Sequence, residues 1–219
     1  MPSSSHSHSF RLTPTDYSAL VERATAGPEL YWKRESERLS WNTAPTHAQC
    51  EKQSWFPGGM LNASVNCLDR HLEARGDQKA LVWQAEDAGR VLTFTYKTLY
   101  EHVCRMANVL RDQGIQAGDR VAIHLPSVPE GLIAMLACAR IGAIHVVLFG
   151  GFSPEAIADR LADSGAALVI TANVGRRGAK RMPFKATLDA ALDLRPDTLA
   201  INAVLVVGVT DDEVGMKPD

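Results

Sequence analysis

Short apolar runs rich in Val and Ile alternate with helix-length amphipathic runs from about residue 78 to the end of the chain. This alternation is typical of a mainly parallel sheet whose faces are both covered by helices. Because crossovers between parallel strands are right-handed, it predicts a doubly wound α/β fold. The expected strands are 80–85, 90–95, 120–125, 143–149, 166–171 and 201–209.

The first two of these runs are joined by a short turn with a glycine, so they are expected to form a hairpin. A helix is expected over 99–110, where apolar residues step by three and four and Gly114 ends the pattern. The run 129–140 is apolar around most of its circumference and is expected to be a buried helix. Ser153, Pro154 and Glu155 begin a further helix, and 188–194 is a short one.

The N-terminal part has a different character. Residues 1–13 are rich in Ser and lack periodicity, which predicts a disordered lead. In the segment 14–77, Tyr17, Leu20, Val21 and Ala24 form one face of a helix that Gly27-Pro28 ends, and 30–38 is a second short helix. The rest of 14–77, which precedes the α/β domain 78–219, is expected to be a loop held by aromatic side chains that wraps over something larger.

Composition excludes several classes of protein. Lys plus Arg number 23 and Asp plus Glu 25, for a net charge of -2 in 219 residues, so a nucleic-acid partner is not expected. The N-terminus lacks the basic and apolar regions of a secretory signal, and the longest apolar run, 132–139, is too short to span a bilayer. We therefore expect a soluble, cytoplasmic protein without a membrane partner.

Four cysteines, at positions 50, 67, 104 and 138, contain no CxxC pair, which argues against a metal cluster or a disulfide framework. Free thiols are expected, with Cys104 and Cys138 as small core residues. His145, inside an apolar strand, is expected to be a core histidine rather than a base. The sequence has no GxxxxGK[ST], GxGxxG, GxSxG or HExxH, so we assign no catalytic residue and no metal ligand.

Ligands of an open parallel sheet bind beyond the carboxyl ends of its strands, and three loops leave such ends. In 125–130, Ser127 or Glu130 faces a ligand or, as we favour, the segment is only a rigid turn. The loop 149–154 either brings backbone amides close to a phosphate or an extended chain, or is a tight turn held by two Phe; both interpretations stay open.

The third loop, 171–185, is the most basic part of the chain. It is either a dock for a terminal phosphate or a solvated basic loop, and composition alone favours the second. Binding of RNA is less favoured because the loop lacks interleaved aromatic residues. Its cations are Arg176, Arg177, Lys180, Arg181 and Lys185.

Taken in order, five stretches resemble the AMP-forming acetyl-coenzyme A synthetases of the adenylate-forming ligase superfamily. The stretches resemble WFxGGxLN at 55–62, NCLDRHL at 66–72, GDRVAI at 118–123, AMLACARIGA at 134–143 and VVFGGFS at 147–153. The resemblance runs from about residue 31 to about residue 192. It implies the first part of that family's large α/β domain, preceded by its N-terminal extension.

The resemblance also implies a binding site for coenzyme A (CoA), because 171–185 occupies the place of the family's CoA-contact segment, TADEGxRxGxxxPLK. Arg177 and Lys180 would hold the 3′-phosphate and adenine end of CoA. The sequence departs from the family at 179–181, where Gly-Lys or Gly-Arg followed by a neutral residue is usual, and a Lys in place of an Arg weakens bidentate binding of phosphate. The stretch 83–87 also departs from the family's Trp-Glu-x-Asp, in a region expected to be structural. The other implied contacts are Gly178 and Ala179 in the loop, Phe149, Gly150 and Gly151 along the pantetheine, and Arg176 and Arg181 as possible further phosphate contacts.

The implied reaction joins acetate to CoA through an acetyl-adenylate, with ATP as substrate and Mg²⁺ clamping its phosphates. The family's phosphate loop, acyl pocket, ribose-binding Asp and C-terminal domain with its adenylation Lys have no counterpart in the sequence. We therefore expect a front piece that is inactive alone and whose partners are acetate, ATP, CoA and the remaining C-terminal part. A propionyl- or other short-chain acyl-CoA synthetase, a non-catalytic CoA-binding module, and a structural piece of a split or truncated enzyme are the alternatives.

Overall fold

The structure is a computed structural model that describes residues 12–49, 55–86, 89–178, 180–194 and 199–216. The chain divides into two compact units, Met1–Leu61 and Asn62–Asp219. Most of the predicted disordered lead, 1–13, lies outside the described residues. No helix in the described part of the chain is long and apolar enough to cross a membrane.

The first unit begins with the two predicted helices, α1 (Pro14–Ala26) and α2 (Pro28–Ser36). The Thr13 side chain accepts a hydrogen bond from the backbone N–H of Asp16, whose carboxylate accepts one from the Thr13 amide, so α1 has a capping box. Pro28 occupies the first position of α2, which therefore starts and ends earlier than predicted.

The aromatic loop after α2 holds itself together by ring contacts, as the sequence predicts. Trp32 and Trp55 meet edge to face at 5.6 Å, and Trp41 lies 5.7 Å from Phe56. Ala48 is the one buried apolar residue among the described residues of this unit. Aromatic contacts therefore take the place of an aliphatic core.

The second unit is built on a parallel four-stranded sheet in the order β4-β3-β5-β8. Its strands are β3 (Arg120–His124), β4 (Ile144–Val147), β5 (Leu168–Ala172) and β8 (Ala203–Val207). The helices of this layer are α5 (Tyr96–Asp112), α6 (Pro129–Ile141), α7 (Pro154–Ser164) and α8 (Phe184–Leu194). Three of these strands lie within predicted runs, β5 extends one residue beyond its run to Ala172, and the doubly wound α/β fold is confirmed.

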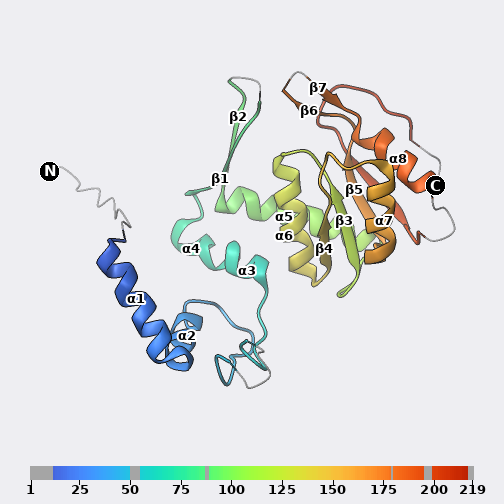
Figure 1. Cartoon of the computed structure of the whole chain (residues 1–219). Helices are drawn as coiled ribbons and strands as arrows, with labels where there is room; N and C mark the ends of the chain where they lie inside the picture. Colours follow the sequence, from blue (N-terminus) through green and yellow to red (C-terminus); the bar gives the residue numbers. More distant parts are fainter. Residues whose placement is uncertain (1–11, 50–54, 87–88, 179, 195–198, 217–219) are drawn as a thin grey trace. The chain divides into compact units, whose positions relative to one another are not determined.

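Alternate residues of the central strands pack on opposite faces of the sheet. Val121 and Ile123 join one core with residues of α5 and α6, while Ala122 joins a second core with residues of α7 and α8. Figure 1 shows the two pairs of helices on the two sides of the sheet. Burial on both faces explains why these strands are continuous apolar runs.

The remaining elements of the second unit are short. The predicted hairpin is present as β1 (Lys79–Gln84) and β2 (Val91–Thr95), which pair antiparallel. Three short helical segments precede it: α3 (Ala63–Cys67), the 3₁₀ helix η1 (Asp69–His71) and α4 (Leu72–Arg75). The sequence analysis missed them because each is too short to show a helical period.

The expectations about the start of α8 and about His145 are wrong. Helix α8 begins at Phe184 rather than 188, because the pattern of its first turn was taken for part of the basic loop. His145 is exposed, since β4 is an edge strand and only one of its sides pairs with a neighbour. The buried histidine is His124, at the end of the central strand.

Arg140 at the end of α6 ties three elements together. Its guanidinium forms two hydrogen bonds of 2.7 and 2.9 Å to the Asp69 carboxylate, and it lies 4.8 Å from the centre of the Tyr100 ring. Its Nε also lies 3.4 Å from Cys104 Sγ. Bidentate geometry and partial burial make this pair stronger than an exposed ion pair.

We expect Asp69→Asn to lower the free energy of unfolding by about 2 kcal/mol, because it leaves a half-buried guanidinium without its counter-charge. Urea unfolding followed by circular dichroism measures the change. Glu101→Gln, on the exposed face of α5, removes the same charge and is expected to have no effect. Equal stability of the Asp69→Asn variant and the wild type would contradict this role.

His124 is fully buried at the carboxyl end of β3. Its Nδ1 lies 3.4 Å from Thr171 Oγ1, its ring contacts Phe184 at 4.8 Å between centres, and its Nε2 has no hydrogen-bond partner among the described residues. Burial lowers the pKa of His124 from 6.5 to about 4, because the charged imidazolium would lose its hydration.

This pKa shift predicts a loss of stability in acid. Above pH 6.5 the imidazole is neutral in both the folded and the unfolded chain. As the pH falls from 6.5 towards about 4, the unfolded chain takes up a proton that the folded chain does not, so the free energy of unfolding falls by up to about 3 kcal/mol.

His124→Gln removes this titration. We expect the stability of the wild type relative to His124→Gln, measured by urea unfolding, to decrease steadily over that pH range. A difference between the two proteins that does not change with pH would show that His124 is not the titrating group.

Candidate functional site

The three loops singled out in the sequence lie around one crevice at the carboxyl ends of neighbouring strands. They follow β3, β4 and β5, and β3 is hydrogen-bonded to the other two strands. The crevice has a volume of 480 Å³. Its lining residues are Glu86, Leu125, Pro126, Ser127, Val147, Leu148, Phe149, Gly150, Gly151, Arg176, Arg177, Met182 and Phe184.

One side of this crevice is aromatic, and it explains the glycines of the second loop. A Cβ on Gly150 would lie 2.7 Å from Phe184 Cζ, and a Cβ on Gly151 would lie 2.7 Å from Phe149 Cε1. Gly175 is under the same constraint, because its Cβ would lie 2.5 Å from Phe184 Cε2. Gly150 and Gly175 are thus required for packing of the buried Phe184 ring, whereas the exposed Phe149 ring beside Gly151 can move; contact of these glycines with a ligand stays a prediction.

The basic segment is a hairpin rather than an irregular loop, which corrects the sequence analysis. Strand β6 (Gly175–Arg177) pairs antiparallel with β7 (Lys180–Met182). Charged residues on both strands hid this element, since a hairpin of three-residue strands offers no apolar alternation. The predicted contact Ala179 lies outside the described residues.

The register of this hairpin sorts its cations into two pairs. Arg177 lies opposite Lys180, and Arg176 lies opposite Arg181. Directly opposed residues share a face of the ladder, so the two cations that the family resemblance assigns to phosphate lie together. Arg181 instead donates a 2.7 Å hydrogen bond to Asp212, and in this structure its charge is already paired.

Lys185 does not belong to the basic hairpin, contrary to the count of five cations. It lies in the first turn of α8 and is buried. Its Nζ is 2.8 Å from the Asp189 carboxylate and donates to the carbonyl of Gly215 at 3.3 Å. Four cations therefore remain on the hairpin.

Asn173 fixes the base of the hairpin to the segment after β8. Its Nδ2 donates to the carbonyls of Thr210 and Asp212 at 2.8 Å each, and its Oδ1 accepts from the backbone N–H of Val209 at 2.9 Å. The Asn173 carbonyl accepts from the Lys185 amide at 3.2 Å. This network holds the hairpin at the carboxyl ends of β5 and β8.

The β1–β2 hairpin supplies a further wall that the sequence analysis did not assign to the site. Trp83 Nε1 donates a 2.7 Å hydrogen bond to the carbonyl of Ser127, in the loop after β3. The Glu86 carboxylate accepts a hydrogen bond from the backbone N–H of Gly178. Trp83, Glu86, Ser127, Arg176 and Gly178 also line an adjoining crevice of 280 Å³. Glu130, the other candidate of the first loop, lines neither crevice.

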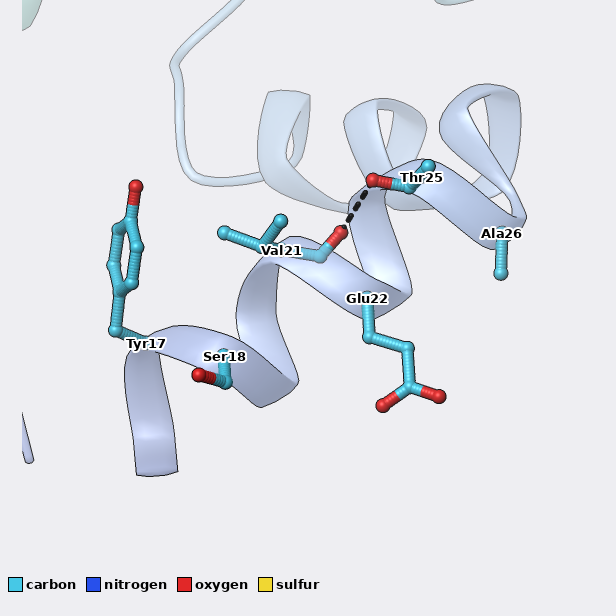
Figure 2. Close-up of a pocket in the computed structure, with 6 residues that line it drawn as sticks. All are labelled: Tyr17, Ser18, Val21, Glu22, Thr25 and Ala26. Carbon is cyan, nitrogen blue, oxygen red and sulfur yellow. Dashed lines mark hydrogen bonds between the residues drawn. The ribbon is translucent and has the colours of Figure 1, made fainter. Parts of the chain in front are cut away.

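Two further hollows are each lined mainly by one short stretch of the chain. One of them, of 490 Å³ on one face of α1, is lined by Tyr17, Ser18, Val21, Glu22, Thr25 and Ala26. Figure 2 shows that all these side chains come from a single helix, with one carboxylate among them.

No three His, Cys, Asp or Glu side chains lie together as a metal site in the described part of the chain. Cys67, Cys104 and Cys138 are free, and burial raises the pKa of Cys138 to about 11.

Two family models match adjacent parts of the chain. Residues 68–215 match the model described as AMP-binding enzyme, and residues 17–67 match the model for the acetyl-coenzyme A synthetase N-terminus. The division of the two matches lies close to the boundary between the compact units.

Curated relatives cover nearly the whole chain. It is 45% identical over 213 residues to acetyl-coenzyme A synthetase 2 of Pseudomonas putida, a match that covers 95% of this chain and 33% of the relative. It is 47% identical over 208 residues to acetyl-coenzyme A synthetase of Caulobacter vibrioides, covering 92% of this chain and 32% of the relative. The chain thus spans about a third of the length of the curated relatives that it matches.

A solved structure has the same fold. The acetoacetyl-CoA synthetase from Streptomyces lividans aligns with a TM-score of 0.79 at 25% identity, over 91% of this chain and 31% of that chain. The resemblance found in the sequence motifs is confirmed by these matches. The chain therefore belongs to the AMP-binding enzyme family, and its curated relatives named here are acetyl-coenzyme A synthetases.

Proposed function

We propose that this chain supplies the CoA-binding face of an AMP-forming acetate–CoA ligase. The observation that carries the proposal is the pairing of Arg177 with Lys180 on one face of the basic hairpin, beside a crevice at the strand ends. In the proposed reaction the acetate carboxylate attacks ATP to give acetyl-adenylate and pyrophosphate. The thiolate of CoA then attacks the acetyl carbon and AMP leaves.

The chemistry of the crevice suits a long ligand with an anionic end. Arg177 offers a planar guanidinium fork and Lys180 a compact charge, which together match a phosphate monoester. Phe149, Gly150 and Gly151 offer an apolar, narrow path for a slim chain such as pantetheine. Arg176 lines the crevice and is a further candidate for phosphate, whereas Arg181 would first have to leave Asp212.

The adenylation step is proposed to depend on residues other than those of this chain. Its sequence has no phosphate loop, and its described residues hold no cluster suited to Mg²⁺. Acetate, ATP, Mg²⁺ and a C-terminal part of the enzyme are accordingly proposed partners. We propose a cytoplasmic location, where CoA and ATP are available.

The identity of the acid is a secondary proposal. Acetate is favoured by the names of the curated relatives, while a larger short-chain acid is favoured by the structural match to an acetoacetyl-CoA synthetase. Binding of CoA is common to both, so the test below does not depend on the acid.

We expect Arg177→Ala and Lys180→Ala each to weaken binding of CoA about tenfold, or about 1.4 kcal/mol, because each removes a charge-assisted contact to phosphate. Lys180→Arg is expected to tighten binding by restoring a bidentate fork. Isothermal titration calorimetry against CoA and dephospho-CoA measures these effects. Arg105→Ala, which removes an exposed cation of α5, is the matched control. Equal affinity of the wild type for the two ligands would refute the phosphate dock.

The purified chain is expected to make no acetyl-CoA from acetate, ATP, Mg²⁺ and CoA. The physical reason is that nothing in its sequence matches the groups that stabilise the phosphoryl oxygens during adenylation. Chromatographic detection of acetyl-CoA is the measurement, with a full-length acetyl-coenzyme A synthetase as positive control. Product above the level of a reaction without protein would overturn this expectation.

A further inference from the structure

An acidic side chain occupies the tip of the basic hairpin. Glu86 follows β1, and its carboxylate accepts a hydrogen bond from the backbone N–H of Gly178, at the turn between β6 and β7. Gly178 has a φ of +60°, a left-handed conformation that its lack of a side chain permits. A carboxylate bound to a backbone N–H makes the same type of contact as a phosphate oxygen.

The surroundings of Glu86 are otherwise cationic. It is the one carboxylate among the residues that line the 480 Å³ crevice, and Arg176 and Arg177 line that crevice with it. Lys180 lies opposite Arg177 in the ladder. Within the described ranges, these three cations form no ion pair, whereas Arg181 is paired with Asp212. Glu86 therefore lies beside three cations that have no ion-pair partner among the described residues.

The contact of Glu86 is not what anchors its hairpin. The β1–β2 hairpin is tied to the loop after β3 by the 2.7 Å hydrogen bond from Trp83 to the Ser127 carbonyl. Its base is further held by a 3.0 Å hydrogen bond from the Tyr96 amide to the Gln78 carbonyl. Glu86 itself is exposed, so its side chain can turn into solvent without opening the core. The contact with Gly178 is thus free to break when another anion arrives.

We propose that Glu86 is an internal competitor for phosphate, which occupies the anion position at the tip of the basic hairpin until a phosphate ester displaces it. This inference rests on the proposed CoA-binding function and adds a residue that sets its affinity and selectivity. A carboxylate and a phosphate repel each other and require the same donor, so binding of the 3′-phosphate of CoA moves Glu86 away. The chain pays this cost for CoA and not for dephospho-CoA, which lacks that phosphate.

Glu86→Gln tests the inference because it keeps the size of the side chain and removes its charge. We expect this variant to bind CoA about five- to tenfold more tightly than the wild type, since repulsion of the phosphate is gone. Its affinity for dephospho-CoA is expected to stay within about twofold of the wild type. Calorimetric titrations of both ligands at low and high salt give the four dissociation constants, and the gain for CoA should shrink as salt screens the charges.

The control variant is Glu101→Gln, which changes net charge equally on the exposed face of α5. A tighter binding of CoA by Glu101→Gln as well would mean that net charge alone is responsible and would overturn the inference. Weaker or unchanged binding of CoA by Glu86→Gln would also overturn it, because a brace that orders the hairpin gives that result.

Failure of the proposed function has a different signature. If the wild type binds CoA no better than dephospho-CoA, the phosphate dock itself is absent, and the role of Glu86 falls with it. If the wild type prefers CoA but Glu86→Gln leaves that preference unchanged, the dock stands and only the role of Glu86 is wrong.

Discussion

The central strand β3 is hydrogen-bonded on both sides, to β4 and to β5, and the site depends on this pairing. The chain leaves β3 towards β4 through α6 and then crosses to β5 through α7, so the two connections cover opposite faces of the sheet. Loops that diverge in this way leave a crevice open at the carboxyl ends of the strands. The aromatic residues and the basic hairpin both lie beside this crevice, on the loops that leave the strand ends.

Phe184 determines the shape of the crevice that this topology leaves open. Its ring contacts buried His124 below and fills the space that side chains on Gly150 and Gly175 would need. A residue of α8 thereby fixes the loops after β4 and β5 at once. From sequence alone, the glycines of the loop after β4 are compatible with binding of a phosphate. In the structure, Gly150 is explained by the close approach of the Phe184 ring.

Strands, helices and the family were predictable because they rest on long patterns: Val- and Ile-rich runs, helical periods and five motifs in a fixed order. The hairpin of β6 and β7 was not, since its residues are mostly charged and its pairing depends on contacts distant in sequence. Burial of single polar residues was also missed, because it depends on contacts between residues that are distant in sequence or on the order of the strands. Lys185 counts as a cation in the sequence, yet Asp189 neutralises it inside the fold. His124 and His145 each lie in an apolar strand, and only strand order distinguishes the central one from the edge.

The net charge of the chain does not describe how single charges are arranged on its surface; the fold determines that arrangement. A chain with a net charge of -2 has no long-range attraction for polyanions, so the selectivity for phosphate that we propose would come from a few cations held in register. The antiparallel ladder places Arg177 opposite Lys180, while Asp212 neutralises Arg181. Glu86 then reaches the tip from a separate hairpin. Because these charges come from several backbone elements, β6, β7, the segment after β8 and the segment after β1, the fold rather than the composition determines what this surface attracts.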